Sequence, residues 1–161
     1  MKVKTLVTNG LIAALYIALS LSIQPIAFSS IQFRLPEVFN HLVVFNKKYF
    51  FGIVLGVFIT NLFSPLGLYD LFFGVAHSAL SLGIIIFLAR YIKNTWLLLI
   101  VNTLVFTFNM YIVAFELKLA LQLPFLLSWF TTAIGEIAVM GIGIPIMYAL
   151  NKKLNFHHLI R

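Results

Sequence analysis

The sequence predicts an all-α integral membrane protein, a compact bundle of six transmembrane helices with both termini in the cytoplasm. Three observations support this fold class. The chain of 161 residues is 62% hydrophobic and only 9% charged, and a soluble domain of this size could not hide that much apolar surface from water. The apolar residues fall into six runs, and one helical crossing needs roughly 20 of them. Basic residues concentrate in alternate loops, as the positive-inside rule expects.

The six runs fill almost the whole chain. They leave no room for a separate soluble domain, so residues 1–161 are expected to form a single transmembrane domain. The first run lacks a cleavage site of small residues at its end and is interpreted as a retained helix. The predicted helices cover residues 6–26, 32–46, 49–64, 68–90, 95–115 and 123–149.

Lys and Arg residues define the expected orientation. Nine of the eleven basic residues precede the first run or follow the second, fourth and sixth runs, whereas the opposite loops hold only Lys118. Basic loops mark the cytoplasmic side. If the short second run did not cross the membrane, the basic loops would lie on both sides of it. The run is therefore expected to cross, with a break or tilt near Pro36. The nine are Lys2, Lys4, Lys47, Lys48, Arg90, Lys93, Lys152, Lys153 and Arg161.

Composition and motifs exclude several classes of protein. The absence of Cys removes disulfides, thiolate catalysis and Cys-based metal sites. There is no GxxxxGKS/T phosphate-binding loop, no HExxH or GxSxG motif and no His cluster with metal-ligand spacing. We therefore expect no enzyme, no metal and no cofactor. The net charge of +7 indicates a basic cytoplasmic face near anionic lipid rather than a nucleic acid partner.

Three polar side chains fall on one face of the second run. Arg34, Glu37 and His41 are spaced i, i+3 and i+7 near its outer end, which aligns them along a helix. Arg34 and Glu37 can form an ion pair one turn apart. Charges at membrane depth cost about 3 kcal/mol or more, so the alternative is a binding site for a polar solute that enters from outside.

A second polar stripe descends the fourth run from its outer end. It begins at Asp70 and continues through Gly74, His77 and Ser81. Asp70 is explained either by the favourable position of a carboxylate in the first turn of a helix or by contact with a ligand. His77 lies deeper, where a hydrogen bond to a neighbouring helix and a role in binding are both open.

The fifth run carries Asn102, Asn109 and Glu116 at seven-residue intervals, with Phe106 between them on the same side. Hydrogen bonding between helices explains Asn102 adequately. Asn109 lies nearer the outside and is the better candidate for contact with a solute. Glu116 is expected in an outer loop that reaches Gln122.

The sixth run places one carboxylate near the middle of the bilayer. Glu136 lies twelve residues after Pro124, which is about 18 Å along a helix. Trp129 and Thr132 share its face. A carboxylate at this depth is costly unless it is protonated, paired or holds a ligand, and Glu136 is predicted to bind a solute.

Small residues mark two close-packing surfaces. Gly52 and Gly56 form a row on the third run that is expected to pack inside the bundle, whereas Ala14 and Ala18 on the first run could face a partner protein. Six helices without an evident inverted repeat are few for a self-sufficient secondary transporter. The pattern therefore points to a solute-binding membrane subunit that takes its energy from another protein.

Four segments carry a resemblance to a known family. They are LIAALYIALS (11–20), IQFRLPE (31–37), TNLFSPLGLYDLFFG (60–74), and the Gly135–Glu136 pair in a last helix that ends in GIPIMYALNKK. These segments resemble the QueT family, substrate-binding S components of energy-coupling factor (ECF) transporters implicated in uptake of queuosine precursors. The likeness spans nearly the whole chain and is most specific at QFRxxE and LGLxDxxFG.

The resemblance implies a multi-pass protein of the plasma membrane with a ligand pocket near the extracellular side. It also implies a complex with a transmembrane coupling (T) subunit and two ATPase subunits. The spacing of Ala14 and Ala18 resembles the AxxxA motif by which S components dock on the coupling subunit.

The implied ligand, a 7-deazaguanine, assigns roles to the polar residues. Its N1–H and exocyclic amine form a donor pair that a carboxylate accepts, and its carbonyl needs a donor. Asp70 would suit a precursor that carries an aminomethyl cation. The predicted substrate contacts are Glu136 or Glu37 for the donor pair, Asn109 and Arg34 for the carbonyl, Trp129 or Phe106 for stacking, and in addition Asp70 and His77.

Three alternatives stay open at the level of the sequence. The chain could be an S component for another vitamin or nucleobase, such as thiamine. It could be a proton-coupled carrier that uses Glu136 as its proton site. It could also be a small membrane enzyme acting on lipid phosphates, although such an enzyme is expected to place metal-binding carboxylates or Arg and His clusters at the cytoplasmic face.

Overall fold

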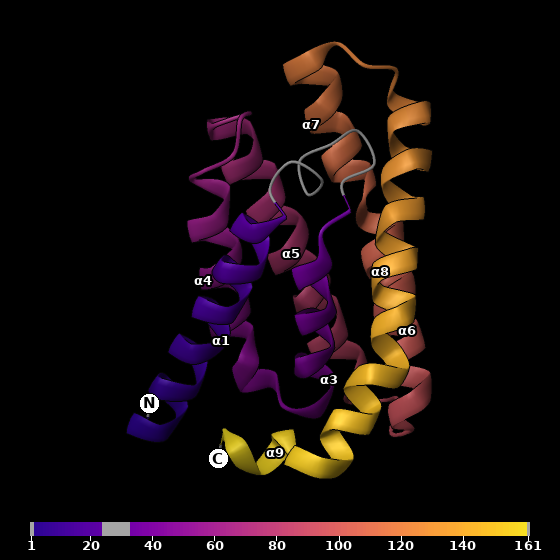
Figure 1. The fold of residues 1–161 in the computed structure, drawn as a ribbon. Helices are drawn as coiled ribbons and strands as arrows, with labels where there is room; N and C mark the ends of the chain where they lie inside the picture. Colours follow the sequence, from indigo (N-terminus) through magenta and orange to yellow (C-terminus); the bar gives the residue numbers. More distant parts are fainter. Residues whose placement is uncertain (1, 24–32, 161) are drawn as a thin grey trace.

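The computed structural model describes residues 2–23 and 33–160, and within them every regular element is a helix. The predicted loop at 27–30, the start of the second run and Arg161 lie outside the described residues. The elements are α1 (Val3–Ser22), η1 (Leu35–His41), α3 (Leu42–Phe45), η2 (Lys47–Tyr49), α4 (Phe50–Asn61), α5 (Leu68–Leu88), α6 (Thr95–Asn109), α7 (Tyr111–Leu121), α8 (Phe125–Leu154) and α9 (Phe156–Leu159), shown in Figure 1.

Four segments are long and apolar enough to cross a membrane: α1, α5, α6 together with α7, and α8. The second and third predicted runs form shorter helices, the apolar stretch Leu35–Phe45 and the 12-residue α4. At 1.5 Å per residue, 12 residues span only about 18 Å. The all-helical membrane class is therefore confirmed, and the long spans number four among the described residues.

The second run differs from its prediction as a regular helix. It begins with the 3-10 helix η1, whose first turn contains Pro36, and becomes α-helical only at Leu42. Pro is tolerated in a first turn because its missing N–H has no partner there. Arg34 precedes η1 at φ −96° and ψ 86°, outside helical geometry, so Arg34 does not lie on the helical face predicted for it with Glu37 and His41.

The fifth run continues beyond its predicted end at residue 115. The helix is interrupted at Met110, and α7 then extends to Leu121. The predicted outer loop from Glu116 to Gln122 is therefore wrong for most of its length. Glu116 faces the bundle interior, whereas Lys118 is exposed. The two charged side chains therefore lie on opposite faces of one continuous helix and do not mark a loop.

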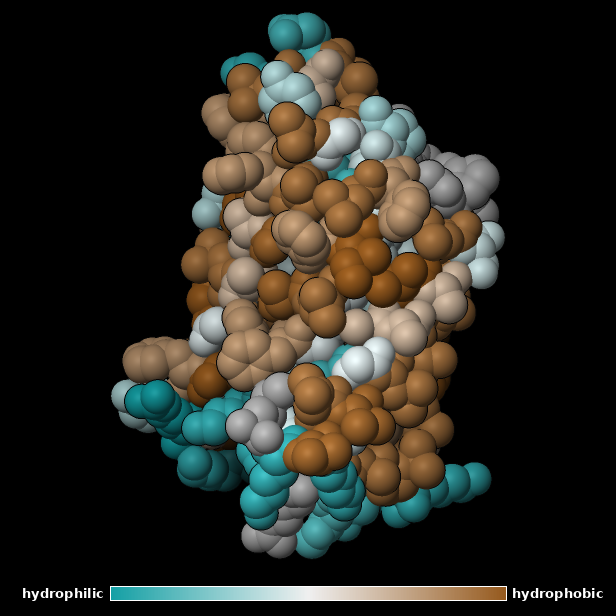
Figure 2. Space-filling model, turned by 90° about the vertical axis from the view of Figure 1, so that its left-hand side faces the viewer, coloured by the Kyte–Doolittle hydropathy of each residue, from teal (hydrophilic) through white to brown (hydrophobic). Residues whose placement is uncertain are grey.

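Both chain ends lie at one end of the bundle (Figure 1). Lys4 Nζ donates to the carbonyl of His158 at 3.1 Å, and the Thr5 hydroxyl donates to that of Ile160 at 3.2 Å. The loops after α3 and α5 meet at the same end, where Lys47, Arg90 and Lys93 line one pocket with His157. Figure 2 shows hydrophilic residues at this end and a broad hydrophobic band above it, as expected of a chain whose middle contacts lipid.

Helix α1 packs closely on α4 through the two glycines of the predicted small-residue row. Gly52 N–H donates to Asn9 Oδ1 at 2.9 Å. A Cβ at Gly52 would lie 2.7 Å from the backbone oxygen of Asn9, and one at Gly56 would lie 2.8 Å from Tyr16 Cβ. This close approach positions α1 so that the Tyr16 hydroxyl reaches the interior of the bundle.

We expect Gly52→Ala to lower the free energy of unfolding by about 1–3 kcal/mol, the usual cost of overpacking a close contact. Thermal unfolding of the detergent-purified protein measures it. Gly83→Ala is the matched control, since a Cβ at Gly83 has nothing within 4 Å and Ala favours a helix by up to about 1 kcal/mol. Equal unfolding temperatures for the two variants would contradict the close α1–α4 contact.

Candidate functional site

The site is built around a buried ion pair between Arg34 and Asp70. Arg34 Nη2 lies 3.1 Å from Asp70 Oδ1, and both side chains are buried. Asp70 occupies the first turn of α5, which begins after Gly67 at φ 59°. Asp70 thus has the favourable position at a helix N-terminus that was predicted for it. Its carboxylate also pairs with Arg34, the residue that precedes η1.

Residues at the end of α4 hold Asp70 in place. The Ser64 hydroxyl donates to Asp70 Oδ2, and Asn61 Nδ2 donates to the backbone oxygen of Asp70 at 2.9 Å. Gly74, one turn along α5, leaves the space that Asn61 occupies, because a Cβ there would overlap Asn61 Nδ2 and would lie 3.6 Å from Arg34 Nη1. The segment 60–74 therefore positions the Asp70 carboxylate and makes room for Arg34.

Glu37 does not pair with Arg34 in the way its spacing predicted. Tyr16 Oη donates to Glu37 Oε1 at 2.8 Å, and Asn40 Nδ2 donates to Glu37 Oε2. Each carboxylate oxygen thus has a neutral donor, one from α1 and one from η1 itself. Arg34 pairs instead with Asp70, 36 residues away.

Two further carboxylates reach the interior without a donor. Glu116 of α7 is 0% exposed and Glu136 of α8 is 1% exposed. Neither oxygen of either side chain meets a hydrogen-bond donor among the described residues. A buried polar group left in this way costs about 1–3 kcal/mol, more when it is charged, so these two side chains are the strongest candidates for contact with a ligand.

All four acidic side chains of the protein are buried and interact with Arg34. Glu37, Asp70, Glu116 and Glu136 are the only acidic residues of the sequence, all four are buried, and each interacts electrostatically with the Arg34 guanidinium. Glu116 also interacts with Asp70, and Glu136 interacts electrostatically with Glu37. Arg34 thus interacts with two carboxylate pairs, Asp70 with Glu116 and Glu37 with Glu136. In each pair one member is hydrogen-bonded and the other has no donor among the described residues.

The predicted polar residues farther along the bundle form hydrogen bonds within the protein. Asn102 Nδ2 and His41 Nδ1 are 3.0 Å apart, and His41 Nε2 lies 2.9 Å from the carbonyl of Met140. This pattern requires neutral His41 with its proton on Nε2. His77 Nε2 lies 3.2 Å from the backbone oxygen of Phe106, which is the interhelical hydrogen bond weighed for it above.

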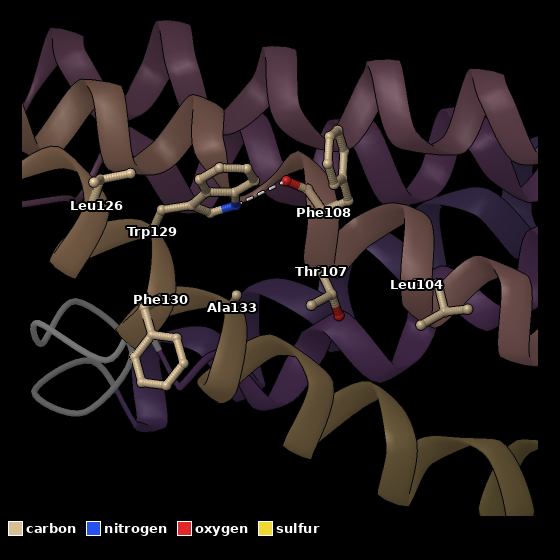
Figure 3. A pocket seen from close by; sticks show the side chains of 7 residues that line it. All are labelled: Leu104, Thr107, Phe108, Leu126, Trp129, Phe130 and Ala133. Atoms are coloured by element: carbon tan, nitrogen blue, oxygen red, sulfur yellow. Dashed lines mark hydrogen bonds between the residues drawn. The ribbon is translucent and has the colours of Figure 1, made fainter.

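The remaining predicted contacts divide between the interior and the surface. Asn109 Nδ2 donates to Ser81 Oγ at 2.9 Å, and the buried ring of Phe106 packs edge-on against His77 at 5.4 Å. Trp129 instead lines an open apolar groove of about 580 Å³ between α6 and α8, and its indole N–H donates to Phe108 O at 3.1 Å (Figure 3). The groove is lined by Leu104, Thr107, Phe108, Leu126, Trp129, Phe130 and Ala133.

Sequence reasoning missed three contributors to the site. Glu116 was assigned to a loop, although its seven-residue spacing from Asn109 already placed it on the inward stripe. Tyr16 and Ser64 carried no signal, because a single Tyr or Ser in a membrane helix is common and only the tertiary fold brings them to Glu37 and Asp70. Among the described residues, no three His, Asp or Glu side chains form a group that could hold a metal ion.

Comparison with known proteins decides the family. The QueT transporter family matches residues 6–152. The queuosine precursor transporter QueT of Lactococcus lactis subsp. cremoris (strain MG1363) is 34% identical over 162 residues, covering 96% of each chain. This chain belongs to the QueT transporter family. No solved structure matches it. QueT proteins are transporters and not enzymes, and this QueT chain is a multi-pass protein of the plasma membrane.

Proposed function

We propose that this chain is the S component of an ATP-driven ECF importer and captures a 7-deazaguanine queuosine precursor from outside the cell. Its partners are then a transmembrane coupling subunit and two ATPase subunits. The name of the Lactococcus relative supports the substrate class. The observation that carries the binding role is the buried carboxylate of Glu136, which meets no donor from the described protein.

A 7-deazaguanine supplies the donors that Glu136 lacks. Its N1–H and exocyclic amine lie side by side and fit the two oxygens of one carboxylate. Glu37 is the weaker candidate for this contact because its oxygens already accept from Tyr16 and Asn40. We therefore assign the N1–H and the exocyclic amine to Glu136, and we place Glu37 next to this contact in the wall of the site.

The carbonyl oxygen of the base requires a donor beside Glu136. Arg34 interacts electrostatically with Glu136 and its guanidinium has five N–H donors, so we assign the carbonyl to Arg34. Asn109 uses one amide hydrogen for Ser81 and is a second candidate. Phe106 is the better stacking residue, since it is buried in the interior, whereas Trp129 faces the apolar groove.

The distribution of charge supports an orientation with both termini in the cytoplasm. Basic residues gather at the end that carries both termini, and such an end faces the cytoplasm. Asp70 lies in the first turn of α5, while Arg90, just after α5, lines the basic pocket, so the acidic cluster is displaced toward the opposite, extracellular side. In this proposal η1 with α3, and α4, supply the second and third of six crossings.

We expect Glu136→Gln to weaken binding of a 7-deazaguanine about 10- to 100-fold, since one charge-assisted hydrogen-bond pair is lost. Titration calorimetry on the full chain in lipid nanodiscs measures the affinity. Lys118→Gln, which removes an exposed charge instead, is the control and should bind as the wild type does. Unchanged affinity in Glu136→Gln would remove Glu136 from the site. Tighter wild-type binding of thiamine or riboflavin would overturn the substrate class.

A further inference from the structure

Three basic side chains and a histidine gather around a pocket at the end of the bundle that carries both termini. The pocket has a volume of about 390 Å³ and is lined by Lys47 after α3, by Arg90 and Lys93 after α5, and by His157 of α9. Pockets that bind small ligands commonly hold roughly 300–1,000 Å³. The segments that carry these side chains are far apart in the sequence, so the tertiary fold brings the cations together.

The acidic side chains of the protein are not placed to neutralise these cations. All four Asp and Glu side chains are buried and interact with Arg34, and among the described residues no Asp or Glu lines this pocket. Asp70 lies in the first turn of α5, whereas Arg90 follows the end of α5, about 30 Å away at 1.5 Å per residue. The pocket therefore concentrates positive charge and favours an anion.

The end of α5 accounts for part of this charge but not for all of it. Lys93 Nζ donates to the carbonyl of Ala89 at 3.4 Å, and cations are favourable near the last turn of a helix. Lys47 belongs to η2 and has no such role at α5. An ammonium has three N–H donors and a guanidinium has five, so Lys93 and Arg90 retain donors for a bound anion.

The rest of the pocket lining is largely apolar. It includes Val44 and Phe45 of α3, and Ile86 and Ala89 from the end of α5, all of which are half-buried. Because the apolar residues precede the basic ones on each segment, the lining changes from apolar to cationic toward the end of the bundle. A phospholipid has the same order of groups, an acyl chain followed by a phosphate. A free inorganic anion would leave the apolar lining without a partner.

We propose that this pocket binds one anionic phospholipid, with its phosphate among Lys47, Arg90 and Lys93 and the start of an acyl chain against the apolar lining. Basic pockets between transmembrane helices on the cytoplasmic side bind such headgroups, and the orientation proposed above puts this lipid in the inner leaflet. The site is separate from the acidic interior, so it does not depend on the transported substrate. The bound lipid contacts α3, α5 and α9 together and stabilises their packing.

The test compares two lipids with the same acyl chains, anionic phosphatidylglycerol and zwitterionic phosphatidylcholine. Native mass spectrometry of the full chain in detergent, titrated with each lipid, gives the affinity of the first bound lipid. We expect the wild type to bind phosphatidylglycerol at least about tenfold more tightly, because three cations attract its net negative charge. Lys47→Gln/Arg90→Gln/Lys93→Gln should weaken phosphatidylglycerol about 100-fold, roughly fivefold for each cation removed, and should change phosphatidylcholine much less.

The matched control is Lys2→Gln/Lys152→Gln/Lys153→Gln, which removes three exposed basic side chains outside the pocket and should keep the preference for phosphatidylglycerol. Lys47→Arg/Lys93→Arg keeps the charges and should bind as the wild type does. Lys47→Gln alone, with a loss of about fivefold, serves if the triple pocket variant does not fold.

Three outcomes would overturn the proposal. Equal losses in the pocket variant and the control would show only a general attraction of lipid to a basic surface. Displacement of the bound lipid by inorganic phosphate would show that the apolar lining does not contribute. Unchanged lipid binding in the pocket variant would leave an acidic segment of a partner protein as the anion that these cations attract.

Discussion

Replacing Arg34 by Met is expected to destabilise the folded protein by about 3–5 kcal/mol, the range for breaking a buried ion pair. Arg34 is the cation that all four buried carboxylates share. Its removal leaves Asp70 without its ion-pair partner and increases the repulsion in both carboxylate pairs. The free energy of unfolding, measured by denaturant or SDS titration in mixed micelles, should fall accordingly.

Asp70→Asn should cost less than Arg34→Met, because Arg34 would keep Glu37, Glu116 and Glu136 in its surroundings. In a simple ion pair, loss of either partner would lower the free energy of unfolding by the same amount. A larger loss for Arg34→Met would therefore show that several carboxylates share Arg34. Lys118→Met is the control for removal of one positive charge, and at this exposed position we expect a change within about 0.5 kcal/mol. An Arg34→Met variant as stable as Lys118→Met would rule out the central role of Arg34.

The sequence was sufficient to predict the class of fold and the inward direction of most polar residues. Glu136, Asn102 and His77 are buried as their positions on apolar helices indicated, because a charged or amide side chain in lipid must face the bundle. Helical periodicity orders side chains within one helix only. It therefore could not show that Arg34 pairs with Asp70, a contact created by the packing of two separate segments.

The predicted ends of the runs were less accurate for a related reason. Hydropathy falls at Glu116 and Lys118, and a falling profile normally marks a loop. In the structure the carboxylate is buried and the ammonium is exposed, so the two polar residues mark opposite faces of a helix that continues to Leu121. A break or tilt was expected near Pro36, and the described part of the second run indeed begins there with the 3-10 helix η1.

Replacement of Ala14 and Ala18 by Leu is expected to abolish transport while leaving ligand affinity unchanged. Both alanines lie on the exposed face of α1, whereas Ala13 and Tyr16 face the bundle. Small residues four apart permit close approach of another helix, and the proposed coupling subunit would use this surface. Two isobutyl side chains in place of methyl groups would block that approach, at a cost of about 1–3 kcal/mol for each overpacked contact. They would not touch the acidic cluster.

Cells that express the complete proposed importer would be assayed for uptake of 7-aminomethyl-7-deazaguanine, and the complex would be purified in mild detergent. The Ala14→Leu/Ala18→Leu variant should bind the ligand normally, fail to co-purify with the coupling and ATPase subunits, and take up at least about 100-fold less ligand, as two overpacked contacts imply. Leu11 and Leu15, exposed on the same helix, provide the control: their replacement by Ala removes bulk and should not block assembly. Recovery of an intact, active complex with the double Leu variant would show that α1 does not carry the docking surface.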